Sequence, residues 1–248
     1  MTERRTRVPE ALPQSGWAFP EAMPGDEHGL VGVGADLEPA TLVDAYRRGV
    51  FPWPHETIDA VPWFSPPRRG VLPLDRIHVS RSLARTLRRC GYETTLDESF
   101  AAVIEACREP RPGESGTWIS GELAAAYVGL HRLGHAHSVE VWDGDRLVGG
   151  IYGVLVGGVF CGESMFHRAT DASKVALVDL AARLIEARAG LFEVQHATPH
   201  LRSLGAIEIP REVYVGLLTE LRDDPVQLLC GRLAVSRLLR PDALDVGT

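Results

Sequence analysis

Residues 160–167, FCGESMFH, place a thiol, a carboxylate and a hydroxyl within four consecutive positions. Cys161 or Ser164 would be a nucleophile if a histidine stood close enough to take its proton. Three histidines further along the chain are available as such a base: His167, His196 and His200. GES at 162–164 also matches the start of the G-x-S-x-G nucleophile elbow, but Phe166 occupies the position of the last glycine. The backbone of that turn requires a small residue, so a serine nucleophile is disfavoured.

Glu163 calls for a different chemistry. A carboxylate flanked by Phe160 and Phe166 at the end of a predicted strand must be solvated, paired or used to orient a bound group. For Cys161, no spacing in the sequence pairs the thiol with a base, and cysteine commonly packs as a small apolar side chain. We therefore expect Cys161 to be structural.

Other cofactor and metal signatures are weak in this sequence. His135 and His137 would share one face of a strand, but no third or fourth ligand is evident, so we expect no metal site. The four cysteines form no C-x-x-C pair, which favours reduced thiols. No G-x-G-x-x-G follows a strand and no G-x-x-x-x-G-K-[ST] occurs, so a Rossmann or P-loop nucleotide site is unsupported.

One segment carries a concentrated positive charge. Seven arginines and a single acid, Asp75, lie between Arg68 and Arg89, in a chain whose net charge is -7. Three of the seven recur at helical spacing and share one face: Arg81, Arg85 and Arg88. Such a face is most often plain solvated surface, but its contrast with the acidic chain favours a polyanion, with a phosphate backbone as the natural candidate.

Length and composition are those of a soluble globular protein. The chain has 248 residues, of which 45% are hydrophobic and 24% charged, so it can bury a substantial core. No run approaches the ~20 apolar residues of a membrane-spanning helix. The N-terminus, MTERRTRVPEALPQSGW, lacks the apolar region and cleavage site of a secretory signal, so we expect a cytoplasmic location.

The elements that position these groups fall into two parts. Residues 1–66 are rich in proline, glycine and tryptophan and predict a small N-terminal domain with one helix, capped by Asp36 and stopped at Gly49. Residues 67–240 predict alternating helices and strands, followed by a C-terminal tail at 241–248. Strands are expected at 70–74, 92–96, 136–142, 146–156, 157–166 and 191–195, with a last strand and helix within 208–221.

Four helix starts are predicted from capping residues in the larger part, at Ser80, Asp97, Ser120 and Asp171. Asp143, Gly144 and Asp145 predict a tight turn between two strands, and hairpins interspersed with helices indicate a mixed sheet. The fold class is therefore α+β, a mixed-sheet domain preceded by a small α/β domain.

Eight segments together resemble one family, the leucyl/phenylalanyl-tRNA-protein transferases. They are GVGADLEPATLVDAYRRGVFPW, PWFSPPRRGVLPL, HVSRSL, GTWIS, AYVGLHRLGHAHSVEVW, LVGGIYG, FCGESMFHRATDASKVAL and HLRSLGAIEIPR, and the resemblance runs from about Gly16 to Tyr214. It implies that leucine or phenylalanine, with methionine as a further candidate, passes from aminoacyl-tRNA to the N-terminal amine of proteins beginning with Arg or Lys. The modified protein would be marked for N-end rule degradation. The resemblance further implies a GNAT-like acyltransferase domain and no metal or cofactor. Nothing in the sequence requires more than a monomer, so we expect a monomer.

The resemblance also assigns roles to residues. Catalysis would rest on Glu163, Gln195 and Glu193, where the family's usual residue at the last position is aspartate, and Ser164 would be structural. The aminoacyl-adenosine pocket would be formed by Tyr46, Trp53, Trp118, Tyr127, Phe160 and Met165. The tRNA would be held by Arg76, Arg81, Arg85, Arg88 and Arg89.

Two alternatives stay open at this point. A CoA-dependent N-acetyltransferase would share the domain type, but the sequence contains no [RQ]-x-x-G-x-[GA] pyrophosphate loop. A non-catalytic adaptor would bind tRNA or N-terminal peptides and form no product.

Overall fold

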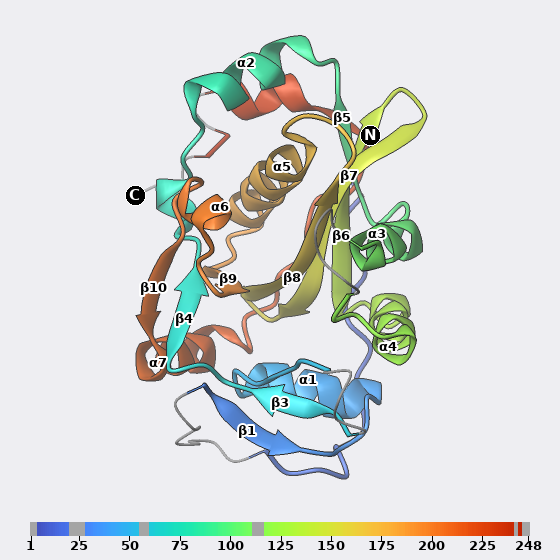
Figure 1. Ribbon diagram of the computed structural model, residues 1–248, viewed down its shortest axis with the longest axis vertical. Coiled ribbons are helices and arrows are strands. Elements are labelled where there is room, and N and C mark those ends of the chain that lie inside the picture. Colours follow the sequence, from blue (N-terminus) through green and yellow to red (C-terminus); the bar gives the residue numbers. More distant parts are fainter. Residues whose placement is uncertain (1–3, 20–27, 55–59, 111–116, 241–242, 245–248) are drawn as a thin grey trace.

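The computed structural model describes residues 4–19, 28–54, 60–110, 117–240 and 243–244. The predicted tail at 241–248 lies partly outside these residues. Two sheets organise the chain (Figure 1). The smaller sheet has the order β1-β3-β2 and contains β1 (Leu30–Val33), β2 (Phe51–Pro52) and β3 (Pro62–Phe64).

The larger sheet has eight strands in the order β10-β4-β9-β8-β7-β6-β5-β11. They are β4 (Arg68–Val71), β5 (Glu93–Leu96), β6 (Ala136–Asp143), β7 (Arg146–Val156), β8 (Val159–His167), β9 (Leu191–Gln195), β10 (Ile207–Pro210) and β11 (Leu233–Ala234). Neighbouring strands are antiparallel except β8 and β9, which are parallel. The predicted mixed sheet and α+β class are confirmed.

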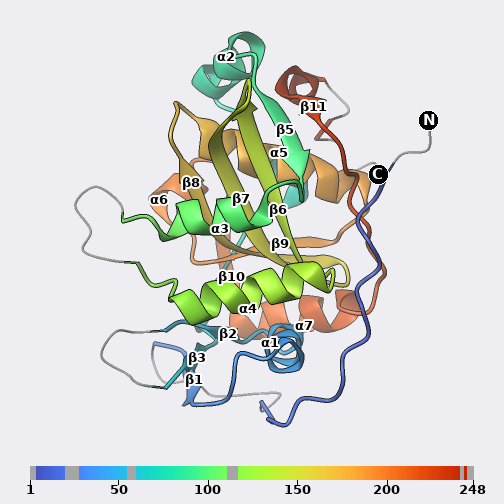
Figure 2. The same cartoon turned by 90° about the vertical axis from the view of Figure 1, so that its right-hand side faces the viewer.

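Helices cover both faces of the larger sheet. They are α1 (Pro39–Arg47), α2 (Arg81–Arg89), α3 (Phe100–Arg108), α4 (Gly121–Arg132), α5 (Ala172–Glu186), α6 (Pro199–Arg202) and α7 (Arg211–Leu221), with short 3₁₀ turns η1 (Leu74–Arg76) and η2 (Val235–Leu239). Figures 1 and 2 show α5 against one face and α3 and α4 against the other. A separate apolar core fills the space on each side, because both faces of the central strands are buried. None of the described helices has the length and apolarity that crossing a membrane requires.

Serine caps are predicted correctly. The Ser80 hydroxyl accepts a hydrogen bond from the Leu83 amide (3.2 Å) at the start of α2, and Ser120 does the same for Leu123 (3.1 Å) at the start of α4. Each hydroxyl satisfies one of the amides that a helix leaves unpaired at its first turn.

The aspartate caps behave differently. Asp36 does not cap α1, because the helix begins after Glu38, and the Asp36 carboxylate instead accepts a hydrogen bond from the Glu38 amide (3.1 Å). Asp171 does precede α5, but its side chain makes no capping bond. It accepts hydrogen bonds from Thr86 Oγ1 (2.8 Å) and Lys174 Nζ (2.9 Å), which join α2 to α5.

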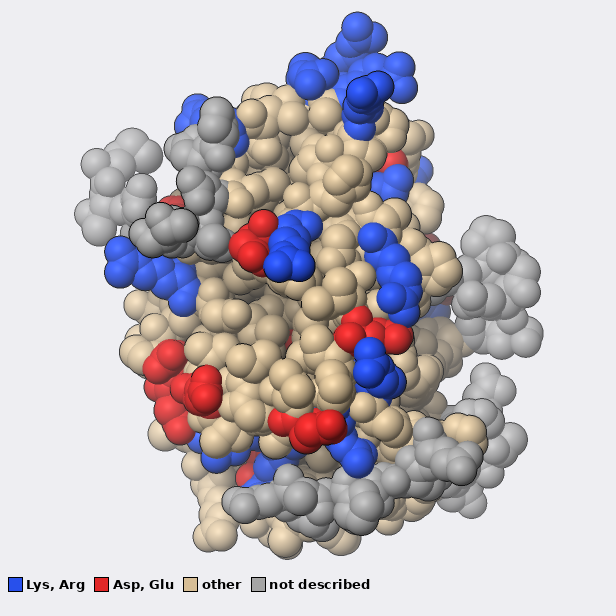
Figure 3. All heavy atoms as spheres, turned by 90° about the vertical axis from the view of Figure 1, so that its left-hand side faces the viewer, with Lys and Arg blue, Asp and Glu red and all other residues tan. Residues whose placement is uncertain are grey.

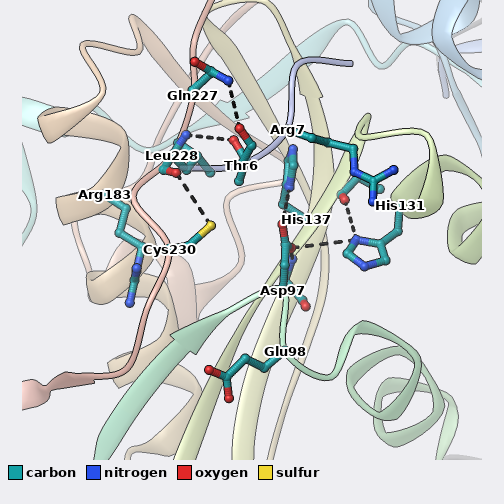
Figure 4. Close-up of polar contacts among 12 residues, drawn as sticks. Thr6, Arg7, Asp97, Glu98, His131, His137, Arg183, Gln227, Leu228 and Cys230 are labelled. Atoms are coloured by element: carbon teal, nitrogen blue, oxygen red, sulfur yellow. Dashed lines mark hydrogen bonds and ion pairs between the residues drawn. The ribbon is translucent and has the colours of Figure 1, made fainter. Parts of the chain in front are cut away.

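Asp97 also does not cap the helix that follows it, since Ser99 stands at the N-cap of α3. Its carboxylate accepts hydrogen bonds from the Ser138 amide (2.9 Å) and from His137 Nδ1 (2.7 Å). Figure 4 shows it between His137 and His131, whose Nδ1 lies 3.8 Å away. The Asp97 carboxylate therefore joins the turn after β5 to β6. An imidazole partner offsets the burial of a carboxylate better than a helix amide alone.

The two ends of the chain run side by side. The Thr6 amide donates to the Leu228 carbonyl (2.9 Å), and Gln227 Nε2 donates to the Thr6 carbonyl (2.8 Å; Figure 4). Further along, Arg183 of α5 donates to the Leu229 carbonyl. The C-terminal segment is thus held between the N-terminal arm and α5.

A buried acid of α5 also holds the C-terminal segment in place. Asp179 of α5 is fully buried and accepts hydrogen bonds from Arg183 Nε (2.6 Å), Arg237 Nη2 (2.5 Å) and Thr94 Oγ1 (2.7 Å). Arg183 is fully buried as well. Two cations therefore depend on one carboxylate in a dry environment.

We predict that Asp179→Ala lowers the free energy of unfolding by about 3–5 kcal/mol, because the variant leaves Arg183 buried without its carboxylate. Urea denaturation of the two proteins measures the difference. Glu105→Ala is the control, since Glu105 pairs with Arg108 at the surface and its loss should cost about 0.5 kcal/mol or less. Equal midpoints for Asp179→Ala and the wild type would show that the network does not stabilise the fold.

Candidate active site

A cavity opens where the two parallel strands separate. β8 and β9 are paired from Val159 and Leu191 to Cys161 and Glu193, after which β8 continues beside β7 and β9 beside β4. The cavity has a volume of about 720 Å³. Its walls include Trp53, Trp118, Glu163, Met165, Gln195 and His196. The fold thus places the two predicted polar residues, Glu163 and Gln195, in one cavity.

Glu163 reaches this cavity through a β-bulge. The pairing of β7 with β8 shifts between Tyr152 and Gly153, which face Ser164 and Gly162, so Glu163 is left without a partner across the strands. A bulge re-aims the extra side chain and is common beside active sites. The alternation of the strand by itself therefore does not determine where this carboxylate points.

Three side chains donate hydrogen bonds to the Glu163 carboxylate. Tyr46 Oη lies 2.7 Å and Gln195 Nε2 lies 3.0 Å from Oε1, and Tyr127 Oη lies 2.9 Å from Oε2. The two tyrosine hydroxyls are 2.6 Å apart. Because Tyr46 belongs to α1 and Tyr127 to α4, the carboxylate joins three separate parts of the chain at the cavity wall.

The environment of Glu163 moves its titration to neutral pH. Its pKa is raised to about 7, chiefly by burial and in part by the nearby Glu193, although the hydrogen bonds from Tyr46 and Tyr127 and the charge of Arg69 favour the charged form. Burial, followed by the charge of Glu163, raises the pKa of Tyr46 and of Tyr127 well above the usual value. Both hydroxyls therefore stay protonated donors, while Glu163 can take up or release a proton near pH 7.

A buried ion pair lies beneath the cavity. Arg69 Nε is 2.7 Å from Glu193 Oε1, and the two side chains are 1% and 0% exposed. Arg69 also donates to the Gly49 carbonyl (2.7 Å) and lies against the rings of Phe51 and Tyr214, 4.8 and 4.5 Å from their centres. Burial would favour the neutral guanidine, but the Glu193 carboxylate outweighs it and raises the Arg69 pKa, so the guanidinium stays charged.

Glu193 fixes the backbone that presents Gln195. The Gln195 amide donates to the same Glu193 oxygen that Arg69 binds. Gln195 has a φ of 52°, and the His196 amide donates to the Val194 carbonyl across it (2.6 Å). This tight turn is strained for a residue with a side chain, and such strain persists where the surroundings enforce it. Glu193 does not line the cavity, so its geometry is that of a positioning residue.

Cys161 is packed in the core, as the sequence led us to expect. It is 0% exposed, and its Sγ lies 4.0 Å from Tyr214 Oη. Burial, and then the charge of Glu193, raises its pKa well above the usual value, so the thiolate is disfavoured. The neighbouring Ser164 does line the cavity.

The six predicted pocket residues fall into three groups. Three line the cavity: Trp53, Trp118 and Met165. The rings of Trp53 and Trp118 meet edge to face, with centres 6.4 Å apart. Tyr46 and Tyr127 stand behind Glu163, as described. Phe160 is fully buried in the core against Phe192, with ring centres 5.6 Å apart, and is absent from the cavity wall.

The predicted tRNA-binding arginines gather at one end of the molecule. Figure 3 shows basic side chains at the end where α2 lies. Four exposed arginines of this helix form no ion pair with any described residue: Arg81, Arg85, Arg88 and Arg89. Arg76 is also exposed and lies 3.7 Å from Asp75. Arg69, which the sequence groups with this basic segment, is instead buried with Glu193 and adds nothing to the surface charge.

Sequence reasoning missed the structural role of Arg69 and did not connect it to Glu193. A signal was present, because each residue stands in an otherwise apolar strand pattern, GVL after Arg69 and LF before Glu193. Two opposite charges that a sheet would bury need each other as partners. His196 was also missed as a cavity residue. Its ring lies 5.7 Å from that of Trp53, and partial burial, then Arg69, lowers its pKa.

The two histidines considered as metal ligands have other partners. His135 Nε2 donates to the Glu10 carbonyl (2.9 Å), and His137 is bonded to Asp97. In the part of the chain that the structure describes, no three or more His, Cys, Asp or Glu side chains are arranged to hold a metal ion.

Comparisons with known proteins agree with the resemblance. The family model described as "Leucyl/phenylalanyl-tRNA protein transferase" matches residues 71–219, and the model of that family's N-terminal domain matches residues 35–67. A leucyl/phenylalanyl-tRNA--protein transferase of Shewanella sp. (strain W3-18-1) is 46% identical over 84% of this chain and 87% of its own length. One from Nitratidesulfovibrio vulgaris (strain DP4) is 47% identical over 88% of this chain and 93% of its own.

We predict that iodoacetamide does not modify Cys161 in the native protein at pH 8, because the thiol is buried and its pKa is raised. Mass spectrometry of the peptide that contains Cys161 measures the modification. The control is the same protein in urea, where Cys161 should react fully. Modification of Cys161 in the folded protein would restore it as a candidate nucleophile.

Proposed function

Because the chain belongs to the leucyl/phenylalanyl-tRNA protein transferase family, we propose that its cavity receives the aminoacyl end of a charged tRNA and joins that amino acid to the N-terminal amine of a protein. The protein is an aminoacyltransferase. The observation that carries the proposal is the Glu163 carboxylate, held by three donors at the cavity wall with a pKa of about 7.

The reaction needs no nucleophile from the enzyme, because an aminoacyl ester is already activated. The acceptor's amine nitrogen forms a bond to the ester carbonyl carbon, and the bond from that carbon to the ribose oxygen breaks. The amine gives one proton to the Glu163 carboxylate, and the protonated Glu163 returns a proton to the ribose oxygen, which leaves as a hydroxyl. Orientation of the amine and removal of its proton are the two tasks left to the protein.

Gln195 and Glu193 act on Glu163 in different ways. The Gln195 amide donates directly to Glu163 Oε1, which also accepts from Tyr46, whereas Oε2 accepts from Tyr127 and keeps a lone pair for the amine. Glu193 acts through the strained turn, since its carboxylate holds the Gln195 backbone amide. We therefore assign Glu163 and Gln195 to the reacting groups and Glu193 to positioning.

Leucine and phenylalanine are the side chains that the cavity suits. Trp53, Trp118 and Met165 offer an apolar wall, and a wall of this kind distinguishes ligands by about 1–3 kcal/mol per methylene. Methionine would then be a weaker substrate and not an excluded one. For an acceptor that begins with Arg or Lys, the cavity wall carries a second carboxylate besides Glu163, that of Glu109, which also pairs with Arg168 of the same wall.

The exposed arginines of α2 would hold the tRNA by its phosphates. Backbone contacts position a nucleic acid without reading its sequence, which suits an enzyme that accepts tRNAs of more than one amino acid. A single chain supplies both the arginine helix and the cavity, so we propose a monomer that acts in the cytoplasm, within N-end rule degradation.

We also propose that residues 67–240 form a GNAT-like domain behind a small domain at 1–66. The mixed sheet, with its parallel strands β8 and β9 beside the cavity and helices on both faces, supports this assignment. An acetyl-CoA-dependent enzyme of the same class and a non-catalytic adaptor remain as outcomes of the test.

We predict that the protein converts a peptide beginning with Arg into a product one leucine residue heavier when leucyl-tRNA is supplied, as measured by mass spectrometry. Binding of tRNA and peptide without product would identify an adaptor. Transfer from acetyl-CoA and none from leucyl-, phenylalanyl- or methionyl-tRNA would identify the acetyltransferase.

We predict that Glu163→Gln lowers the transfer rate by about 10²–10⁴, because the amide cannot accept the amine's proton. The pH profile gives an independent readout. As the pH falls below about 7, wild-type Glu163 becomes protonated, and the peptide amine is protonated below about 8. The logarithm of the wild-type rate should therefore fall with slope two below pH 6, and that of Glu163→Gln with slope one.

Ser164→Ala is the matched control, since Ser164 is the next residue in the same cavity wall. Its rate should stay within about threefold of wild type, whereas loss of a nucleophile costs several powers of ten. A slope of one in both wild type and Glu163→Gln would remove Glu163 as the proton acceptor.

We predict that the double variant Arg81→Gln/Arg85→Gln binds tRNA more weakly and that its plot of log affinity against log salt is shallower by about two. Fluorescence anisotropy with labelled tRNA measures both quantities. Arg188→Gln is the control, because Arg188 is exposed just beyond the C-terminal end of α5. Unchanged affinity and slope in the double variant would show that the α2 face is solvent-exposed surface that does not bind tRNA.

A further inference from the structure

A second pocket lies on the other side of α6 from the candidate active site. Its volume is about 500 Å³. His200 and Leu201 line the active-site cavity, whereas the next residues, Arg202 and Ser203, line the second pocket. One helical turn is therefore the wall between them, and Figure 1 shows that turn below α2 and beside α5.

Hydrogen-bond donors predominate in this pocket. Its lining consists of His78, Ser80, Lys174, Arg202, Ser203, Leu204 and Gly205. None of these seven residues is acidic, and two of them carry a full positive charge. An ammonium, a guanidinium, an imidazole and the Ser80 hydroxyl around one space are suited to the oxygens of a phosphate group, whereas the Ser203 hydroxyl already donates to the His200 carbonyl (2.6 Å).

The pocket is preformed by close backbone contact. The His78 amide donates to the Leu204 carbonyl (3.0 Å). Gly205 has a φ of 106°, and a Cβ there would lie 2.4 Å from the Arg76 carbonyl oxygen, so glycine is required. The segments before α2 and after α6 are thus locked together, and little rearrangement would be needed for a ligand to bind.

Each of the two cations is oriented by an acid that lies outside the pocket lining. Lys174 Nζ is 2.9 Å from Asp171, and Arg202 Nη2 is 3.0 Å from Glu208. An ammonium has three N–H donors and a guanidinium has five, so each side chain keeps further donors for a ligand. The Lys174 side chain is 29% exposed and the Arg202 side chain 50%, which leaves both accessible.

Lys174 is the single lysine in the chain. Of the 26 basic residues counted as Lys or Arg, the other 25 are arginine. Lysine and arginine are not interchangeable where a compact ammonium with three donors must fit. Lys174 also stands in the first turn of α5, where the helix dipole disfavours a cation, and the carboxylate of the N-cap residue Asp171 compensates for that placement.

We propose that this second pocket binds a backbone phosphate of the tRNA strand that ends in the aminoacyl ester, an inference that rests on the proposed function. The pocket lies in the right place for that strand. Ser80, in its lining, is the N-cap of the arginine helix α2, and α6 separates it from the cavity. A strand held by α2 therefore passes this pocket before its end enters the active site.

A single lysine makes the proposal directly measurable. Acetylation of the Lys174 ε-amine by a water-soluble acetylating reagent is followed by mass spectrometry, with and without uncharged leucine tRNA. At a tRNA concentration near ten times Kd, the modification should slow by about tenfold. The same tRNA without its terminal CCA, at a concentration that also saturates the protein, should protect Lys174 little or not at all.

Other outcomes overturn the proposal. Equal protection by the two tRNAs would show that the 3′ strand is not what fills the pocket. Protection by inorganic phosphate with none by tRNA would assign the pocket to a free anion. Absence of protection by intact tRNA, at concentrations where anisotropy shows binding, would leave the pocket with no part in tRNA recognition.

Variants give a second readout. Lys174→Met should raise KM for leucyl-tRNA about tenfold, leave kcat unchanged and reduce the salt slope of tRNA binding by about one. Arg188→Met is the matched control, a cation removed from beyond the opposite end of the same helix, and should change none of these quantities. Lys174→Arg should recover the salt slope but not the full affinity, since charge is restored without the ammonium's shape.

The two proposals fail in distinguishable ways. If the wild type forms no leucyl product from any charged tRNA, the proposed function fails. If the wild type is active while Lys174→Met keeps the wild-type KM and salt slope, the function stands and the phosphate site fails alone.

Discussion

The buried ion pair of Arg69 and Glu193 is the interaction on which the site depends. Arg69 comes from β4 and Glu193 from β9, and the guanidinium also holds the Gly49 carbonyl at the end of α1. Two charges at 0–1% exposure are tolerated when each has its partner and further hydrogen bonds. The pair therefore joins the N-terminal elements to the larger sheet and simultaneously fixes the strained turn at Gln195. Loss of either charge would leave the other buried and the turn unsupported.

The surroundings of the Glu163 carboxylate determine its pKa. On one side it accepts hydrogen bonds from two tyrosines that stay protonated, and on the other it faces a cavity with apolar walls. Donors favour the charged form and burial disfavours it, and the balance places the pKa at about 7. A carboxylate of that kind suits proton transfer from an amine. Cys161, two residues before Glu163 on the same strand, is buried with a raised pKa, so the strand does not present a thiolate to the cavity.

Positive charge is concentrated in particular parts of this acidic molecule. The whole chain is acidic, with a net charge of -7, yet α2 and the second pocket both present cations that face solvent. Exposed arginines on a helix can track a flexible anionic backbone, whereas a pocket with a fixed ammonium can hold a single phosphate. The candidate active-site cavity carries two carboxylates, Glu163 and Glu109, and one arginine, Arg168, which pairs with Glu109. The exposed arginines of α2 lie outside this cavity.

The sequence by itself determined the fold class, most of the strands and helices, the serine caps and, by resemblance, the family, because these follow from local periodicity and from residues that lie close together in the chain. It also pointed to Glu163 as a carboxylate in need of a partner. Only the tertiary structure decided which partners it has, since Tyr46, Tyr127 and Gln195 come from three distant segments. Asp36 and Asp97 failed as predicted caps, and Phe160 lies in the core and not in the cavity wall, because packing and long-range pairing outweigh local preference. The bulge at Glu163 and the left-handed turn at Gln195 are backbone features that strand alternation cannot reveal.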